Sequence, residues 1–119
     1  MDVRVIIGHG NAAFADAVFA MCERTAEPLG LSLSLAHVPG AGEFEAALGD
    51  VAARAYLLTP EPARALQPKI SALVGFSVEV QPNNITAEGR PSGGADAQLY
   101  GLGMPGYGTA LELIAERLE

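Results

Sequence analysis

The chain has 119 residues, half of them hydrophobic, with 14 acidic and 7 basic side chains that give a net charge of −7. This length is sufficient for one domain that buries a single core, and the only cysteine excludes an internal disulfide. The negative charge disfavours nucleic-acid and anionic membrane partners and fits plain solubility. No stretch approaches the roughly 20 apolar residues of a membrane span or contains the core of a signal peptide. We therefore expect one cytoplasmic domain over residues 1–119, with no nucleic-acid partner and no membrane partner.

Short apolar runs alternate with helical patterns along the chain. Period-two runs predict strands at 3–8, 31–38, 55–60, 76–80 and, more weakly, 97–103. Helical spacing predicts helices at 12–30, around 43–48, after Pro62 and at 105–119, and we expect Pro68 to end or bend the third of these. The first helix should bury Phe14, Val18, Met21, Cys22 and Leu29, and the last should bury Tyr107, Leu111, Ile114 and Leu118.

Strands that alternate with helices require right-handed crossovers, so the fold class is α/β, with a doubly wound and mostly parallel sheet covered by helices on both faces. Ligands of such sheets bind at the carboxyl ends of the strands. The loops after the first four strands therefore line one crevice in this interpretation. The loop after the first strand, GHGN, has neither the G-x-G-x-x-G spacing nor the lysine of a P-loop, so a flavin or nucleotide module is the poorest alternative.

Glu79 is the most informative acidic residue of the chain. It lies between Val78 and Val80 and points away from them, on a strand that a parallel sheet buries on both faces. A buried carboxylate needs a partner, which is either a ligand or the backbone of neighbouring loops. Arg90 either binds an anionic ligand through its guanidinium group or is a solvated loop residue. His9 is either a general base or a loop histidine. His37 fits a structural role better, and the chain has no metal signature and implies no cofactor.

Four segments of the chain resemble type II 3-dehydroquinate dehydratases, in the same order as in that family. They are RVIIGHGN, GEFEAAL, VEVQPNNITA and LYGLGMPGYGTALELIAERL, at residues 4–11, 42–48, 78–87 and 99–118. The resemblance implies a flavodoxin-like three-layer sandwich with a five-stranded parallel sheet of order 2-1-3-4-5. It also implies a homo-oligomer, a trimer or a dodecamer.

The resemblance also implies site residues. Asn11 is similar to the asparagine that helps to hold the enolate-stabilising water, Glu79 to the strand glutamate, and Asn84 to an asparagine of the substrate-carboxylate loop. Arg90 replaces the family's later arginine if the shortened loop slides. Gln81 and Asn83 complete the loop expected to bind the substrate.

The catalytic groups of that family have no match in this chain. Asn11 leads directly into the first helix, where the family carries a lid with its catalytic tyrosine. Gln81 stands where the family has its acid histidine, and an amide does not supply a proton at neutral pH. Thr59, Gly40 and the pair at 88–89 also depart from the family pattern.

Two functions follow from the resemblance. The first is a dehydratase-like protein with a degenerate site, which binds a small cyclic hydroxy-acid and uses His9 or Tyr100 for a diverged lyase or isomerase reaction. The alternative is a non-catalytic structural or regulatory homologue that assembles with other subunits.

Overall fold

The computed structural model describes residues 2–8, 11–60, 63–83 and 94–119. Strands and helices alternate along them as far as the fourth strand, after which the fifth strand and the last helix follow. The strands are β1 (Val3–Ile7), β2 (Leu33–His37), β3 (Ala55–Thr59), β4 (Phe76–Gln81) and β5 (Ala97–Tyr100). The helices are α1 (Ala12–Leu29), α2 (Ala41–Gly49), α3 (Ala63–Ser71) and α4 (Pro105–Leu118). No helix in these ranges is long and apolar enough to cross a membrane.

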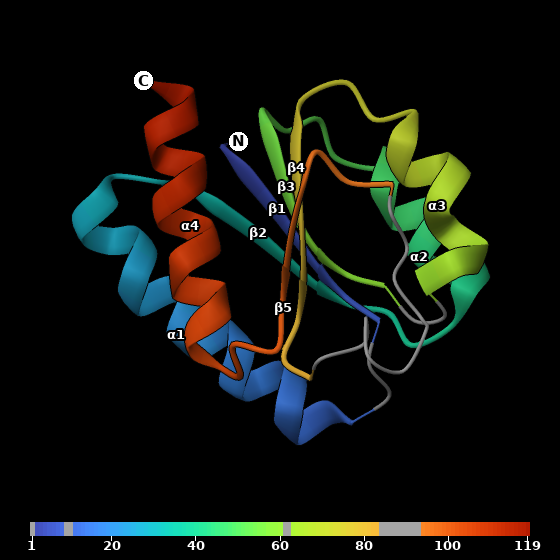
Figure 1. The fold of residues 1–119 in the computed structure, drawn as a ribbon, viewed down its shortest axis with the longest axis horizontal. Coiled ribbons are helices and arrows are strands. Elements are labelled where there is room, and N and C mark those ends of the chain that lie inside the picture. Colours follow the sequence, from blue (N-terminus) through green and yellow to red (C-terminus); the bar gives the residue numbers. More distant parts are fainter. Residues whose placement is uncertain (1, 9–10, 61–62, 84–93) are drawn as a thin grey trace.

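The five strands form one sheet of order β2-β1-β3-β4-β5, in which every neighbouring pair is parallel. Helices α1 and α4 cover one face of this sheet, and α2 and α3 cover the other (Figure 1). The structure thus confirms the predicted three-layer α/β fold and its strand order. It places β1, β3 and β4 inside the sheet, with β2 and β5 at its two edges.

The sheet separates two apolar cores, and the alternation along β4 shows how. Val78 and Val80 pack with the residues of α1 and α4, whereas Glu79 faces the side of α2 and α3, as the sequence predicted. The core under α1 and α4 is the larger and includes the fully buried Tyr107. The core under α2 and α3 is smaller and is centred on Phe44.

One sequence prediction about the helices is wrong, and for another the structure excludes one of two alternatives, that Pro68 ends its helix. Leu29 is 37% exposed, because the 18 residues of α1 span about 27 Å and extend past strands of about 17 Å. Helix α3 continues through Pro68 to Ser71. The N–H missing at position 68 would have bonded a carbonyl in the first turn of the helix, so only one bond is lost, and Leu66 and Ile70 still anchor the helix in the core.

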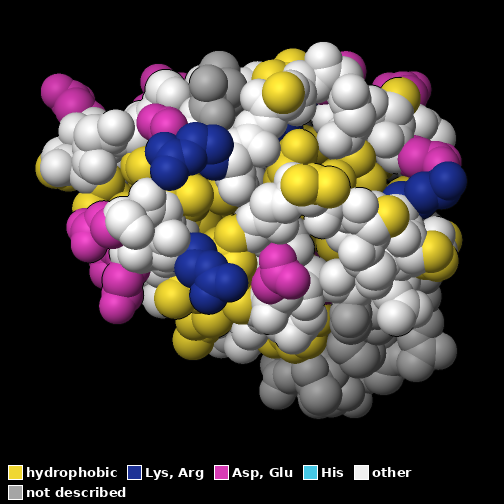
Figure 2. All heavy atoms as spheres, turned by 90° about the horizontal axis from the view of Figure 1, so that it is seen from above, with side chains coloured by type: hydrophobic (Ala, Val, Ile, Leu, Met, Phe, Trp, Pro, Cys, Tyr) yellow, Lys and Arg dark blue, Asp and Glu magenta, His cyan; other side chains and the backbone are white. Residues whose placement is uncertain are grey.

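A buried arginine near the amino ends of the strands links β1 to β2 and α2, and the sequence did not predict these contacts. Arg4 on β1 donates to both carboxylate oxygens of Asp50, at 2.9 and 3.2 Å, and to Ser34 Oγ at 2.6 Å. It therefore ties the end of α2 to β1 and β2. Seen from this end of the molecule, the Lys and Arg side chains form separate spots with acidic side chains between them (Figure 2).

Candidate functional site

The carboxyl ends of β1, β3, β4 and β5 meet at one end of the sheet, and backbone bonds hold them there. Gly8 donates to the Thr59 carbonyl at 2.8 Å, which links the loops after β1 and β3. Gly101 donates to the Gln81 carbonyl at 3.0 Å and to that of Asn83 at 3.2 Å, which links the turns after β4 and β5. These bonds hold the described ends of the strands together at the place where a ligand would bind.

Glu79 is the centre of a polar cluster at this end. Its side chain is fully buried, and Oε1 accepts a hydrogen bond from the Tyr100 hydroxyl at 3.1 Å. Oε2 accepts a bond from Gln81 Nε2 at 3.3 Å. The sequence left open whether Glu79 bonds to a ligand or to the protein, and these two side chains are partners within the protein.

Gln81 links Glu79 to the residue that follows β3. Its amide nitrogen donates both to Glu79 and to the buried carbonyl of Pro60, at 3.0 Å. Because a primary amide has only two N–H groups, both of its donors are used inside the protein. Its carbonyl oxygen is the group that can accept a bond from a ligand hydroxyl.

Tyr100 connects the buried carboxylate to the outside of the molecule. It is half-buried, and it reaches Glu79 because β4 and β5 pair in the register Gln81↔Tyr100 and Glu79↔Gln98. Side chains two residues apart on a strand share one face, so Tyr100, Gln81 and Glu79 face the same side of the sheet. A tyrosine that donates to a carboxylate can pass its proton to that carboxylate while its own oxygen takes up another.

Asn11 lies at the start of α1, where it caps the helix. Its Oδ1 accepts bonds from the backbone N–H groups of Ala13 and Phe14, at 2.9 and 3.2 Å. Capping uses the oxygen of the side chain, so this residue fixes the start of α1 at the end of the sheet where the predicted site lies. The residue is exposed at the same end of the sheet as Gly8.

A second polar pair lies on the opposite face of the sheet. Thr59 Oγ1 is 2.6 Å from the Val80 carbonyl and 2.6 Å from the Tyr107 hydroxyl. A carbonyl only accepts, so Thr59 donates to Val80 and Tyr107 donates to Thr59. Burial raises the pKa of Tyr107 above its usual 10.0, which keeps the phenol protonated and excludes it as a base at neutral pH.

The other predicted residues are placed as follows. Asn83 is exposed just after β4. His37 is half-buried at the end of β2. His9, Asn84 and Arg90 lie outside the described residues, so their predicted roles stay predictions.

The side chains that bind metals do not gather in the described part of the chain. No group of three or more His, Cys, Asp or Glu side chains there could hold a metal ion. Cys22 faces the larger core, and burial raises the pKa of its thiol to about 12.

The sequence matches no protein-family model and no curated protein. Its structure is similar to that of the type II dehydroquinase from Propionibacterium acnes, with a TM-score of 0.83 and 20% sequence identity over 97% of this chain and 96% of the other. It is also similar to a 3-dehydroquinate dehydratase-like protein from Bifidobacterium longum, with a TM-score of 0.79 and 20% identity over 100% and 99% of the two chains. Together with the strand order, these similarities show that the chain has the flavodoxin-like fold of a type II dehydroquinase along almost its whole length.

Proposed function

We propose that the chain binds a small cyclic hydroxy-carboxylic acid at the carboxyl ends of β1, β4 and β5, and that it does not dehydrate dehydroquinate. The observation that carries the proposal is the buried Glu79 bonded to the half-buried Tyr100. This pair lies where ligands of doubly wound sheets bind. It connects a buried acid to a half-buried hydroxyl that can contact a ligand.

The groups around Tyr100 match the chemistry of a polyhydroxy acid. The Gln81 carbonyl oxygen accepts, and the Tyr100 hydroxyl both donates and accepts. A ring that carries several hydroxyls needs such a mixture, because each hydroxyl is at once donor and acceptor. The carboxylate of the ligand is assigned to the loop that begins at Asn83, with Arg90 as its positive partner, and this part of the proposal rests on sequence alone.

Dehydration requires a base and an acid in addition to binding. The sequence has no tyrosine between the first strand and α1, because Asn11 leads directly into the helix. Gln81 is an amide whose two N–H groups are both used inside the protein, so it supplies no proton to a leaving hydroxyl. The described residues offer a proton path from a ligand to Tyr100 and from Tyr100 to Glu79, which suits a diverged lyase or isomerase reaction and stands beside the predicted role of His9.

Calorimetry with dehydroquinate, shikimate and quinate tests the binding proposal. We expect at least one acid to bind the wild type, and Tyr100→Phe to weaken that binding by about 0.5–1.5 kcal/mol. Arg90→Ala should cost about 1.5–3 kcal/mol, the range for a hydrogen bond to a charged group. Tyr107→Phe is the matched control, because it removes a tyrosine hydroxyl from the opposite face of the sheet and should leave binding unchanged.

Two outcomes would contradict the proposal. Failure of all three acids to bind at millimolar concentration would favour the alternative, a non-catalytic structural or regulatory subunit. That alternative gains support from the fact that Gln81 and Tyr100, which donate to Glu79, belong to the protein itself. Rapid formation of the enone product from dehydroquinate, followed by its ultraviolet absorbance, would refute the loss of dehydration.

A further inference from the structure

We propose that the groove between α1 and the edge strand β2 binds an extended basic segment of another protein, which adds a strand to the sheet. Among the described strands, β2 pairs only with β1, and all five of its residues are half-buried. Val38 N donates to the Ile7 carbonyl at 2.9 Å, so the backbone N–H of this residue points toward β1. Because the direction of backbone groups alternates along a strand, the N–H and C=O groups of Leu33 and Leu35 point to the open edge.

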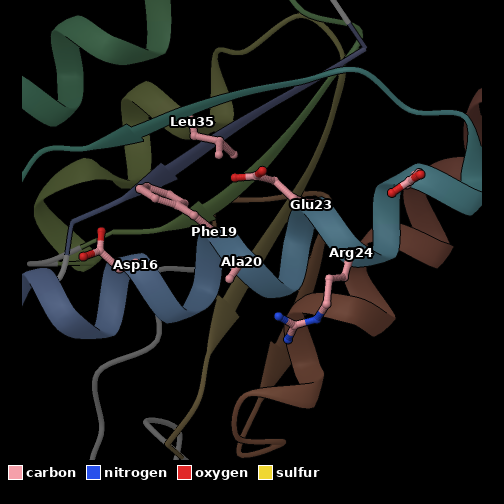
Figure 3. A pocket seen from close by; sticks show the side chains of 7 residues that line it. Asp16, Phe19, Ala20, Glu23, Arg24 and Leu35 are labelled. Atoms are coloured by element: carbon pink, nitrogen blue, oxygen red, sulfur yellow. The ribbon is translucent and has the colours of Figure 1, made fainter.

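The groove beside this edge has an apolar floor and an acidic rim. Its volume is about 550 Å³. It is lined by Asp16, Phe19, Ala20, Glu23, Arg24, Glu27 and Leu35. Phe19, Glu23 and Leu35 point toward one another, whereas Arg24 points to the other side of α1 (Figure 3). The one basic residue of the lining therefore does not neutralise the acids beside β2.

The charge of the groove selects a cationic occupant. Asp16, Glu23 and Glu27 are exposed, and no ion pair or hydrogen bond of these carboxylates occurs in the part of the chain that the structure describes. A second copy of this chain, with its net charge of −7, would bring like charge to the same place. A segment with Lys or Arg side chains would meet three carboxylates that make no ion pair with any described residue.

The dimensions of the groove fit one added strand. Asp16 and Glu27 are eleven residues apart on α1, which is about 17 Å along the helix axis. Five residues of β2 span about the same length. Every second side chain of an added strand would face α1, at intervals of about 7 Å. A basic residue at each end and an apolar residue between them would then meet the acids and the Phe19–Leu35 floor.

The probe for this site is the acetylated and amidated peptide TKTLTKT with a fluorescent label, and the assay is anisotropy with the full chain. We expect a Kd of about 1 mM or tighter. Glu23→Gln/Glu27→Gln should weaken binding about threefold or more, as expected for the loss of two exposed ion pairs. Glu112→Gln/Glu116→Gln on α4 is the matched control, with the same change in net charge and an expected unchanged Kd.

Backbone methylation of the peptide tests strand addition itself. Methyl groups on one alternate set of peptide amides should abolish binding, and methyl groups on the other set should not, because only one set faces Leu33 and Leu35. The amide protons of these two residues should also become protected from exchange when the peptide binds. Absence of binding at millimolar concentration, or equal sensitivity to both methylation patterns, would overturn the proposal. Concentration-dependent protection of Leu33 and Leu35 without peptide would overturn it in favour of a second copy.

Discussion

Thr59 and Tyr107 share a buried hydrogen bond. Tyr107→Phe should therefore destabilise the wild-type protein but stabilise a variant that already carries Thr59→Val. Tyr107 is fully buried and Thr59 is 2% exposed, so water cannot replace either partner. Tyr107→Phe removes one neutral hydrogen bond and should lower the free energy of unfolding by about 0.5–1.5 kcal/mol. Thr59→Val keeps the shape of the side chain but removes the bond to the Val80 carbonyl and leaves the Tyr107 hydroxyl without its acceptor. An unsatisfied buried hydroxyl costs about 1–3 kcal/mol in addition to the lost bond.

In the Thr59→Val background, Tyr107→Phe should therefore restore about 1–3 kcal/mol, because it removes the unsatisfied hydroxyl. Urea unfolding of the wild type, the two single variants and the double variant measures all four free energies. Effects that add to within about 0.5 kcal/mol would refute the reasoning, since additivity is the behaviour of residues that do not interact. It would mean that the hydroxyl finds another acceptor or that the two groups are not in contact.

Three further predictions concern pH, glycine positions and assembly. Burial raises the pKa of Cys22 from 9.0 to about 12 and raises that of Tyr107 above 10.0, so both groups lose their proton first in the unfolded chain. The free energy of unfolding, measured in urea, should therefore fall above about pH 9, by about 1.4 kcal/mol per pH unit for each group. Cys22→Ala should abolish the decrease that begins near pH 9 and leave the decrease due to Tyr107, which begins near pH 10. Gly75→Ala should destabilise by about 1–3 kcal/mol, because φ is +122° and the added Cβ would lie 2.9 Å from the Arg54 carbonyl oxygen. In Gly42→Ala, on α2, the added Cβ meets nothing within 4 Å, so this variant should be stabilised by about 0.5–1 kcal/mol. A higher thermal midpoint for Gly75→Ala than for Gly42→Ala would contradict both predictions. Light scattering should show a homo-oligomer, and a particle of 12.3 kDa at micromolar concentration would count against it.

The sequence predicted the features of the fold that local periodicity encodes. Alternation in β4 placed Glu79 opposite Val78 and Val80, and the succession of strands and helices gave the parallel sheet. Periodicity was less reliable for α1, where the small residues Ala15 and Ala26 take buried positions and Leu29 does not. Apolar spacing does not state how far a helix extends beyond the sheet that it covers.

The contacts of the candidate site depend on pairings between distant residues. Glu79 and Tyr100 were each named from the sequence, but their bond depends on the register of β4 with β5, which no local pattern fixes. The partners Thr59 and Tyr107 are 48 residues apart in the chain. Their contact follows from the packing of α4 on the sheet, so the sequence could assign Tyr107 to the core but not its hydroxyl to a partner.

The sheet separates two apolar cores of unequal size, and this arrangement bears on how the protein can evolve. Most of the large core packs against α1 and α4, and the side chains of Glu79, Gln81 and Tyr100 project from the other face. Substitutions among these three residues therefore leave the packing of the larger core intact. A lineage with this architecture can exchange one polar group for another and drift toward a new ligand or reaction, while selection for foldedness acts mainly on residues that never meet the ligand.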